Sequence, residues 1–218
     1  MSDLEQQNFA NKPRNRRAVV KGAAWSVPVI AAAIAAPAAS ASVANASLAW
    51  SASSTSLISL RLLDGSSGLI TAKVLTTVPT QFTLTNGPGA ISGNATVTIA
   101  IARPTGLNVT VGTARGFGVY SYNGVPSTAA ERTVTYPTAP FIGEYGIPST
   151  RYMSVQPVTV ASNGIINVPV VFGLAGTPGL FNISALSNFV VNLTVDFGNG
   201  AVYTASSSIS VPVGAGLL

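Results

Sequence analysis

The carboxylates are the side chains of this sequence best suited to chemistry, because the chain contains neither histidine nor cysteine. Without these two residues, Ser-His-Asp and Cys-His nucleophiles, thiolate chemistry and nearly all zinc and copper sites are excluded. A glycosidase would need two carboxylates that face each other across the scissile bond. After residue 41 only four remain, in turns, at strand ends and in one loop: Asp64, Glu131, Glu144 and Asp196. We therefore expect a protein that is not an enzyme and that holds no cofactor or metal.

Aromatic side chains are concentrated in residues 117–152, which hold seven of the fourteen aromatic residues that follow residue 41. Tyrosine and arginine on loops are typical of recognition surfaces, because they offer large contact area and hydrogen bonds at low entropic cost. Flat rings beside a few polar groups also suit a sugar ring. The alternative is that the rings pack against the open end of a β-sandwich. The candidate binding patch consists of Tyr136, Phe141, Glu144, Tyr145, Arg151 and Tyr152.

The first 41 residues have the three parts of a secretory signal: a polar basic start, an apolar middle over 22–39 and a small-residue cleavage site. Proline at positions 28 and 37 and the alanine-rich composition make the middle a poor permanent membrane anchor. Ala39-Ser40-Ala41 predicts cleavage by signal peptidase after Ala41. An ordinary Sec signal and an uncleaved anchor remain alternatives.

The run Asn15-Arg16-Arg17-Ala18-Val19-Val20-Lys21 resembles the twin-arginine export motif, in which a polar residue, two arginines and two apolar residues are often followed by lysine. Arg16, Arg17 and Lys21 are the residues that carry this resemblance, whereas the motif favours Phe and Leu where Val19 and Val20 stand. The amino-acid sequence of the leader also resembles leaders of secreted and surface proteins of high-GC Gram-positive bacteria. The resemblance implies the twin-arginine machinery as an export partner and a secreted protein, released or held at the cell wall.

The basic character of the sequence, with a pI near 9.9, comes mostly from this leader. Residues 42–218 contain six basic and four acidic residues, a formal net charge of +2. Six isolated cations make no stripe that could neutralise a row of phosphates, so nucleic acid is excluded as a partner.

Residues 42–218 repeatedly alternate apolar and polar side chains with a period of two, which is typical of half-buried β-strands. Rows of this kind run through 58–62, 97–101, 166–172, 189–197 and 203–213. Glycine-rich turn sequences separate them, and Asn163-Gly164 and Gly198-Asn199-Gly200 are typical of tight hairpins.

The pattern predicts an all-β fold, a two-sheet antiparallel sandwich of about nine to twelve strands over residues 42–218. It resembles immunoglobulin-like bacterial surface modules in pattern only, because the Cys and Trp spacing of true immunoglobulin domains is missing. Two smaller sandwiches that meet near 103–106 are the alternative.

These features together predict a non-enzymatic exported protein that acts at the cell surface or in the medium as a binding or adhesion module. Cell-wall polysaccharide or a surface protein is the expected partner. A structural subunit of a surface layer or fibre is the alternative, because edge strands with few charges favour polymerisation.

Overall fold

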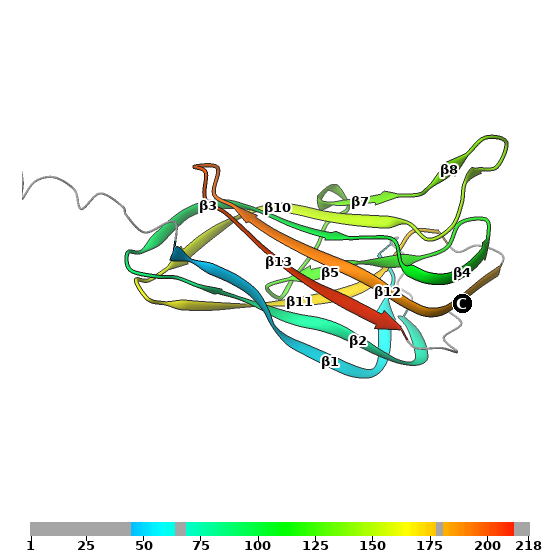
Figure 1. Cartoon of the computed structure of the whole chain (residues 1–218), viewed down its shortest axis with the longest axis horizontal. Helices are drawn as coiled ribbons and strands as arrows, with labels where there is room; N and C mark the ends of the chain where they lie inside the picture. The colour runs from blue at the N-terminus through cyan, green and yellow to red at the C-terminus, as the bar shows by residue number, and fades with distance from the viewer. Residues whose placement is uncertain (1–44, 64–68, 178–180, 212–218) are drawn as a thin grey trace, which may run out of the picture. The chain divides into compact units, whose positions relative to one another are not determined.

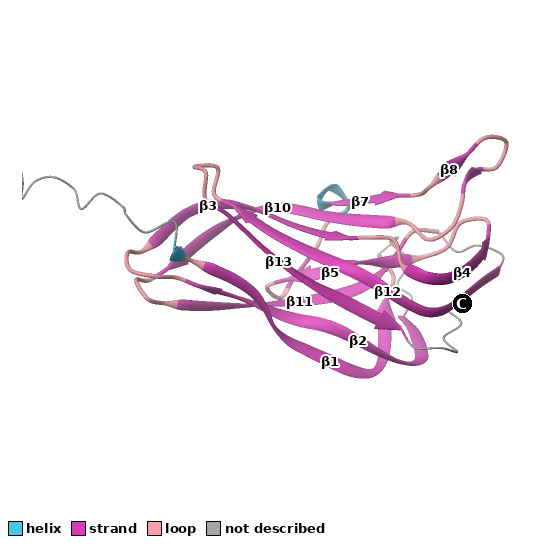
Figure 2. Ribbon diagram, viewed as in Figure 1, coloured by secondary structure: helices cyan, strands magenta, loops and turns pink. Residues whose placement is uncertain are grey.

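The computed structural model describes residues 45–63, 69–177 and 181–211 (Figure 1). The predicted leader, with Arg16, Arg17, Lys21, Ala39 and Ala41, lies outside the described residues, and so does Asp64. Strands dominate the described chain (Figure 2). In chain order they are β1 (Ser47–Arg61), β2 (Leu69–Thr85), β3 (Ile91–Ile101), β4 (Thr105–Val111), β5 (Gly116–Tyr122), β6 (Val125–Pro126), β7 (Arg132–Thr135), β8 (Thr138–Ala139), β9 (Gly143–Glu144), β10 (Ser149–Val160), β11 (Ile165–Ala175), β12 (Phe181–Asp196) and β13 (Val202–Val211).

Antiparallel pairing joins eleven of these strands in the order β6-β5-β11-β2-β13-β12-β3-β10-β7, with β1 beside β2 and β4 beside β12. The connection between β2 and β13 is a single residue pair, Thr77 with Ser210. This narrow connection lets the sheet fold over, so that its two halves form two layers. The predicted all-β antiparallel fold is therefore confirmed, and β8 and β9 form a separate two-stranded sheet.

The core lies between the two layers and is built from the apolar rows that the alternation predicts. Phe117 of β5 packs edge-on against Phe189 of β12, with ring centroids 4.9 Å apart. Tyr122 of β5 stacks on Tyr152 of β10 at 5.8 Å. Neither strand pair shares a hydrogen-bond ladder, so these rings hold the two layers together. The largest fully buried side chains are Phe82, Phe117, Phe189, Leu84, Ile99, Ile101, Leu174, Leu193, Ile209, Val97 and Val119.

The hairpin turns lie where asparagine and glycine predict them. Asn163, between β10 and β11, has φ 54°, and Gly198 and Gly200, between β12 and β13, have φ 72° and 88°. Asn123 and Gly124 connect β5 to β6 with φ 49° and 79°. In the Asn123-Gly124 turn, positive φ at both central residues matches the right-handed twist of the strands on either side.

Strand β5 is not among the alternating rows that the sequence predicts. Both faces of β5 are buried, so no polar row alternates with an apolar one. The strand therefore lacks the alternation by which a half-buried strand is predicted. A Cβ on Gly118 would lie 2.8 Å from Leu63 Cδ1, and one on Gly116 would lie 2.9 Å from the Pro148 carbonyl oxygen. Glycine is thus required where neighbouring segments approach the backbone closely.

The short 3₁₀ turn η2 (Ala129–Glu131) lies between β6 and β7. The Thr128 backbone N–H and hydroxyl both donate to Glu131 Oε2, at 2.7 and 2.9 Å. These bonds cap the N-terminus of the turn. Within 45–63, 69–177 and 181–211, no helix is long and apolar enough to cross a membrane.

Residues 42–218 belong to one unit, and 103–106 lie between β3 and β4 inside it. Both β3 and β4 pair with β12, so the strands on the two sides of this segment share one sheet. The structure therefore places no boundary between two small sandwiches at 103–106.

Candidate functional site

Most aromatic side chains of 117–152 lie in the core or on one projecting hairpin, and Tyr120 of β5 contacts Arg61 instead. Phe117, Tyr122 and Tyr152 are buried, and Tyr152 is only 3% exposed. Burial raises the pKa of the Tyr152 hydroxyl, partly offset by its hydrogen bond with Ser154, so this ring is a neutral core group. The inclusion of Tyr152 in the binding patch is therefore wrong.

The hairpin of β8 and β9 carries the exposed aromatic residues and projects from one end of the sandwich beside β4 (Figure 1). At its tip the Ile142 N–H donates to the Ala139 carbonyl at 3.3 Å, which closes a β-turn around Pro140 and Phe141. Phe141 has φ 67°. Proline followed by a residue of positive φ is the type II pattern, in which glycine or asparagine is favoured at the second position.

Phe141 is thus an aromatic residue at a position that disfavours it, and no packing inside the chain compensates for this. Its side chain is 109% exposed, and that of the adjacent Ile142 is 71% exposed. A bulky residue with positive φ and no contact is a genuine outlier, and such outliers cluster at functional sites.

The base of the hairpin is held firmly by backbone hydrogen bonds. The Tyr145 N–H donates to the Pro137 carbonyl at 3.0 Å, and the Gly146 N–H donates to the Gly112 carbonyl at 2.8 Å. The Ala114 N–H returns a bond to the Gly146 carbonyl at 2.9 Å. Gly146 has φ 74°, so glycine is needed where the chain turns from the hairpin to this contact.

Tyr136 positions the hairpin instead of presenting a binding surface. Its hydroxyl donates to the Ala114 carbonyl at 3.0 Å and accepts the Thr177 N–H at 2.8 Å. A Cβ on Gly176 would clash with this hydroxyl, so the residue before Thr177 must be small. The predicted patch residue Tyr136 is therefore a structural anchor that ties the hairpin stem to the segment after β11.

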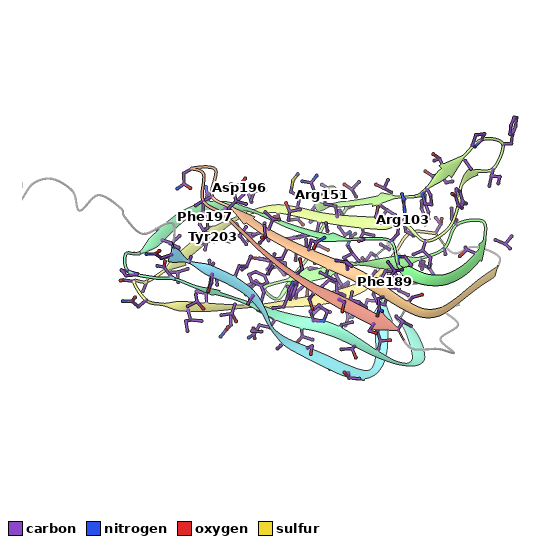
Figure 3. All side chains as sticks on the ribbon, viewed as in Figure 1. Arg103, Arg151, Phe189, Asp196, Phe197 and Tyr203 are labelled. Carbon is purple, nitrogen blue, oxygen red and sulfur yellow. The ribbon has the colours of Figure 1, made fainter. Side chains whose placement is uncertain are left out.

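A pocket of about 290 Å³ lies at the hairpin base and opens to solvent. Tyr145, 39% exposed, and Pro137 line it from the hairpin side, and Ile147 is buried at its edge. Arg103 and Pro104 line it from the connection between β3 and β4, and Arg103 lies at this end of the molecule in Figure 3. The full lining is Arg103, Pro104, Thr110, Pro137, Tyr145, Gly146 and Ile147.

Glu144 and Arg151, the other two predicted patch residues, do not line this pocket. Glu144 is exposed on β9, where it pairs with Thr138 across the hairpin. Arg151 is exposed on β10 between Thr133 of β7 and Ala100 of β3. Of the six predicted residues, the structure thus keeps Phe141, Glu144 and Tyr145 together on one hairpin.

The described carboxylates other than Glu144 have structural partners. Glu131 accepts hydrogen bonds from Thr128 and from Ser154 Oγ, the latter at 2.6 Å, and these bonds lower the pKa of its carboxyl group. Asp196 Oδ1 accepts the Gly198 N–H at 2.8 Å in the turn after β12. In the described part of the chain, no three carboxylates gather as a metal site would require.

Arg103 and Pro104 were not predicted as site residues, because they are far from the hairpin in sequence. They reach it only because the end of β3 pairs with the start of β10, which follows the hairpin. The short sequence Arg103-Pro104-Thr105-Gly106 predicts a turn or a domain boundary and gives no sign of a binding role. No protein-family model matches this chain, and no curated protein matches it in sequence.

Proposed function

We propose that this protein is a non-enzymatic, exported binding module that adheres to a cell-surface component through the tip of the β8–β9 hairpin. The predicted leader with Arg16, Arg17 and Lys21 supports export, and the strand-rich fold agrees with an immunoglobulin-like surface module. Its ligand is a wall polysaccharide or a surface protein.

The exposed Phe141 at a turn position that favours glycine carries the proposal. An exposed ring at a fixed backbone position gives a partner a large apolar anchor at little entropic cost. The hydrogen bonds at the hairpin base hold this anchor in place before any partner arrives.

The arrangement of the described carboxylates supports the proposal of a non-enzymatic role. Glu131 and Asp196 are engaged in local turns, and no carboxylate is among the seven residues that line the pocket. A general acid and base would have to face a common ligand.

Sedimentation with purified cell wall from the native producer tests the adhesion proposal. Phe141→Asn should remove most of the wall-bound fraction, because it deletes the anchor and keeps the turn. Val155→Thr is the matched control, because Val155 is 63% exposed on β10, away from the hairpin. Equal retention of the wild type and Phe141→Asn would refute adhesion through the tip.

Fractionation of the native producer tests export separately. The mature protein should begin at Ser42 and be recovered from the medium or the washed wall, as measured by intact mass. Replacement of Arg16 and Arg17 by Lys should block its appearance there. Full-length protein found only inside the cells would refute this part of the proposal.

A structural subunit of a layer or fibre is the second candidate, and the edge of β1 favours it. Among the described strands, β1 pairs with β2 alone, and the bridge from Leu62 to Leu174 lies just beyond its end. No charged residue occurs in 47–60, and 51–56 are exposed on both faces of the strand. A long uncharged edge is a template for pairing with another strand.

Sedimentation velocity over a range of protein concentrations tests this second candidate. Polymers that form in the wild type and are abolished by Ser54→Lys would support it. Val190→Lys is the control, because β12 already has neighbours on both sides at that position. A monomer at all concentrations would remove this candidate.

A further inference from the structure

We propose that the pocket at the base of the β8–β9 hairpin binds a carboxylated sugar unit, with Arg103 holding the carboxylate and Tyr145 covering a face of the ring. This inference rests on the proposed function, because it names the wall component that the hairpin region would recognise. It adds a second contact, set apart from the Phe141 tip.

The charge of the pocket lining favours an anionic ligand. Of the seven described residues that line the pocket, Arg103 alone is charged. Its guanidinium is exposed, so a ligand can reach it without first breaking a buried ion pair. The planar fork of arginine matches a carboxylate through two parallel hydrogen bonds.

The walls select a ring. Pro104 and Pro137 present saturated rings, Tyr145 presents a half-exposed aromatic face, and Ile147 adds a buried aliphatic surface. Ligand sites commonly combine such apolar walls with a few convergent polar groups. A sugar ring has apolar faces and hydroxyl edges, so its faces fit these apolar walls.

The volume of the pocket suits a single sugar unit of a polysaccharide. About 290 Å³ lies at the lower limit of typical ligand pockets, and the pocket is open to solvent. A polysaccharide could thus place one residue in the pocket while its neighbours leave on either side.

The backbone keeps this pocket preformed. Gly146 is bonded through both its N–H and its carbonyl to the segment after β4, and the Tyr145 N–H is bonded to Pro137. The lining contributed by the hairpin base is therefore fixed relative to β4, which lowers the entropic cost of binding.

Titration calorimetry of the full chain after leader removal tests the proposal with three small probes. They are methyl glucuronide, the neutral methyl glucoside as its matched control, and acetyl-Ala-Ala, a peptide with a free carboxylate. The glucuronide should bind at least about tenfold more tightly than the glucoside, and added salt should weaken its binding. Equal affinity for the two sugars would overturn the proposal, and so would binding of the peptide without binding of the glucuronide.

Substitutions assign the binding to the pocket. Arg103→Gln should weaken glucuronide affinity about tenfold, and Arg103→Lys should weaken it less, because the charge remains but the planar fork is lost. Arg151→Gln is the matched control, because Arg151 is exposed on β10 outside the pocket lining. An unchanged affinity in Arg103→Gln, with its circular dichroism spectrum also unchanged, would overturn the assignment.

The tip variant separates this proposal from the adhesion proposal. Phe141→Asn should bind the glucuronide as the wild type does, because Phe141 is not part of the lining. Loss of wall adhesion in Phe141→Asn with no glucuronide binding in the wild type would refute the pocket alone. Glucuronide binding with wall adhesion unaffected by Phe141→Asn would refute the tip alone.

Discussion

Replacement of Phe141 should affect binding and stability in opposite directions. The side chain is 109% exposed, so its removal costs no apolar burial. The backbone at φ 67° lies in the left-handed region, which costs a residue with a Cβ about 1–2 kcal/mol. Asparagine tolerates this region far better than phenylalanine. Phe141→Asn should therefore raise the free energy of unfolding by about 1 kcal/mol.

Urea denaturation of the purified protein without its leader measures this change. The midpoint should rise while the slope stays constant, because the variant buries the same surface as the wild type. For a domain of this size, about 1 kcal/mol corresponds to a rise in Tm of about 2–4 °C. Phe141→Gly should lie near the wild type, because the greater freedom of glycine in the unfolded chain offsets the relief of strain.

Destabilisation of Phe141→Asn by more than about 1 kcal/mol would refute this reasoning, because it would mean that the ring packs against the fold. Equal stability of all three proteins would mean that the turn stores no strain. Either result would remove the physical reason for assigning Phe141 to the binding of a partner.

Three further substitutions test the packing and the charges. Gly176→Ala should lower the free energy of unfolding by about 1–3 kcal/mol, because a Cβ is disfavoured at φ 97° and would also clash with the Tyr136 hydroxyl. Urea denaturation measures this loss, and adding Tyr136→Phe should recover part of it. Phe189→Ala should cost about 3–5 kcal/mol, because the ring is 1% exposed and packs on Phe117; a loss below about 1 kcal/mol would contradict its place in the core. Hydrogen bonds lower the pKa of the Glu131 carboxyl below its ordinary value of 4.5, so its ionised form stabilises the fold above about pH 4.5, and this contribution is lost as the pH falls through the folded-state pKa. Glu131→Gln should thus be less stable than the wild type at pH 7, and the difference should shrink as the pH falls through the folded-state pKa; a stability difference independent of pH would contradict this.

Alternation of side chains predicts the strands that have one buried and one exposed face. The rows 97–101 and 189–195 are buried as the sequence indicates, because each lies on one face of a half-exposed strand. The same rule fails for β5, where Gly116 and Gly118 allow close packing on one face and the buried Phe117 and Val119 occupy the other. A strand buried on both sides has no polar row by which it can be recognised.

Strand β10 shows why the binding patch could be predicted only in part. Its outward row contains Met153 and Val155, whereas its inward row contains Ser154 and Gln156, so hydrophobicity alone inverts the two faces. Ser154 donates to Glu131, and Gln156 donates to Ser154 at 2.9 Å, so these inward polar groups are satisfied by hydrogen bonds. Tyr152 lies on the same inward row, stacked on Tyr122, and its burial cannot be inferred from neighbouring residues in the sequence.

The hairpin site depends on a division between a rigid base and an exposed tip. Tyr136 and Gly146 tie the base to segments far away in sequence, near Ala114 and Thr177. A free two-stranded hairpin would be only marginally stable in water, so without these bonds the tip would sample many orientations. Fixing the base before binding removes that entropic cost from the association. Tyr136→Phe, which loses the hydrogen bonds of the hydroxyl, should therefore weaken wall adhesion although Phe141 and the pocket lining are unchanged. If adhesion were equal in Tyr136→Phe and the wild type, the base would contribute nothing to recognition, and the tip alone would account for binding.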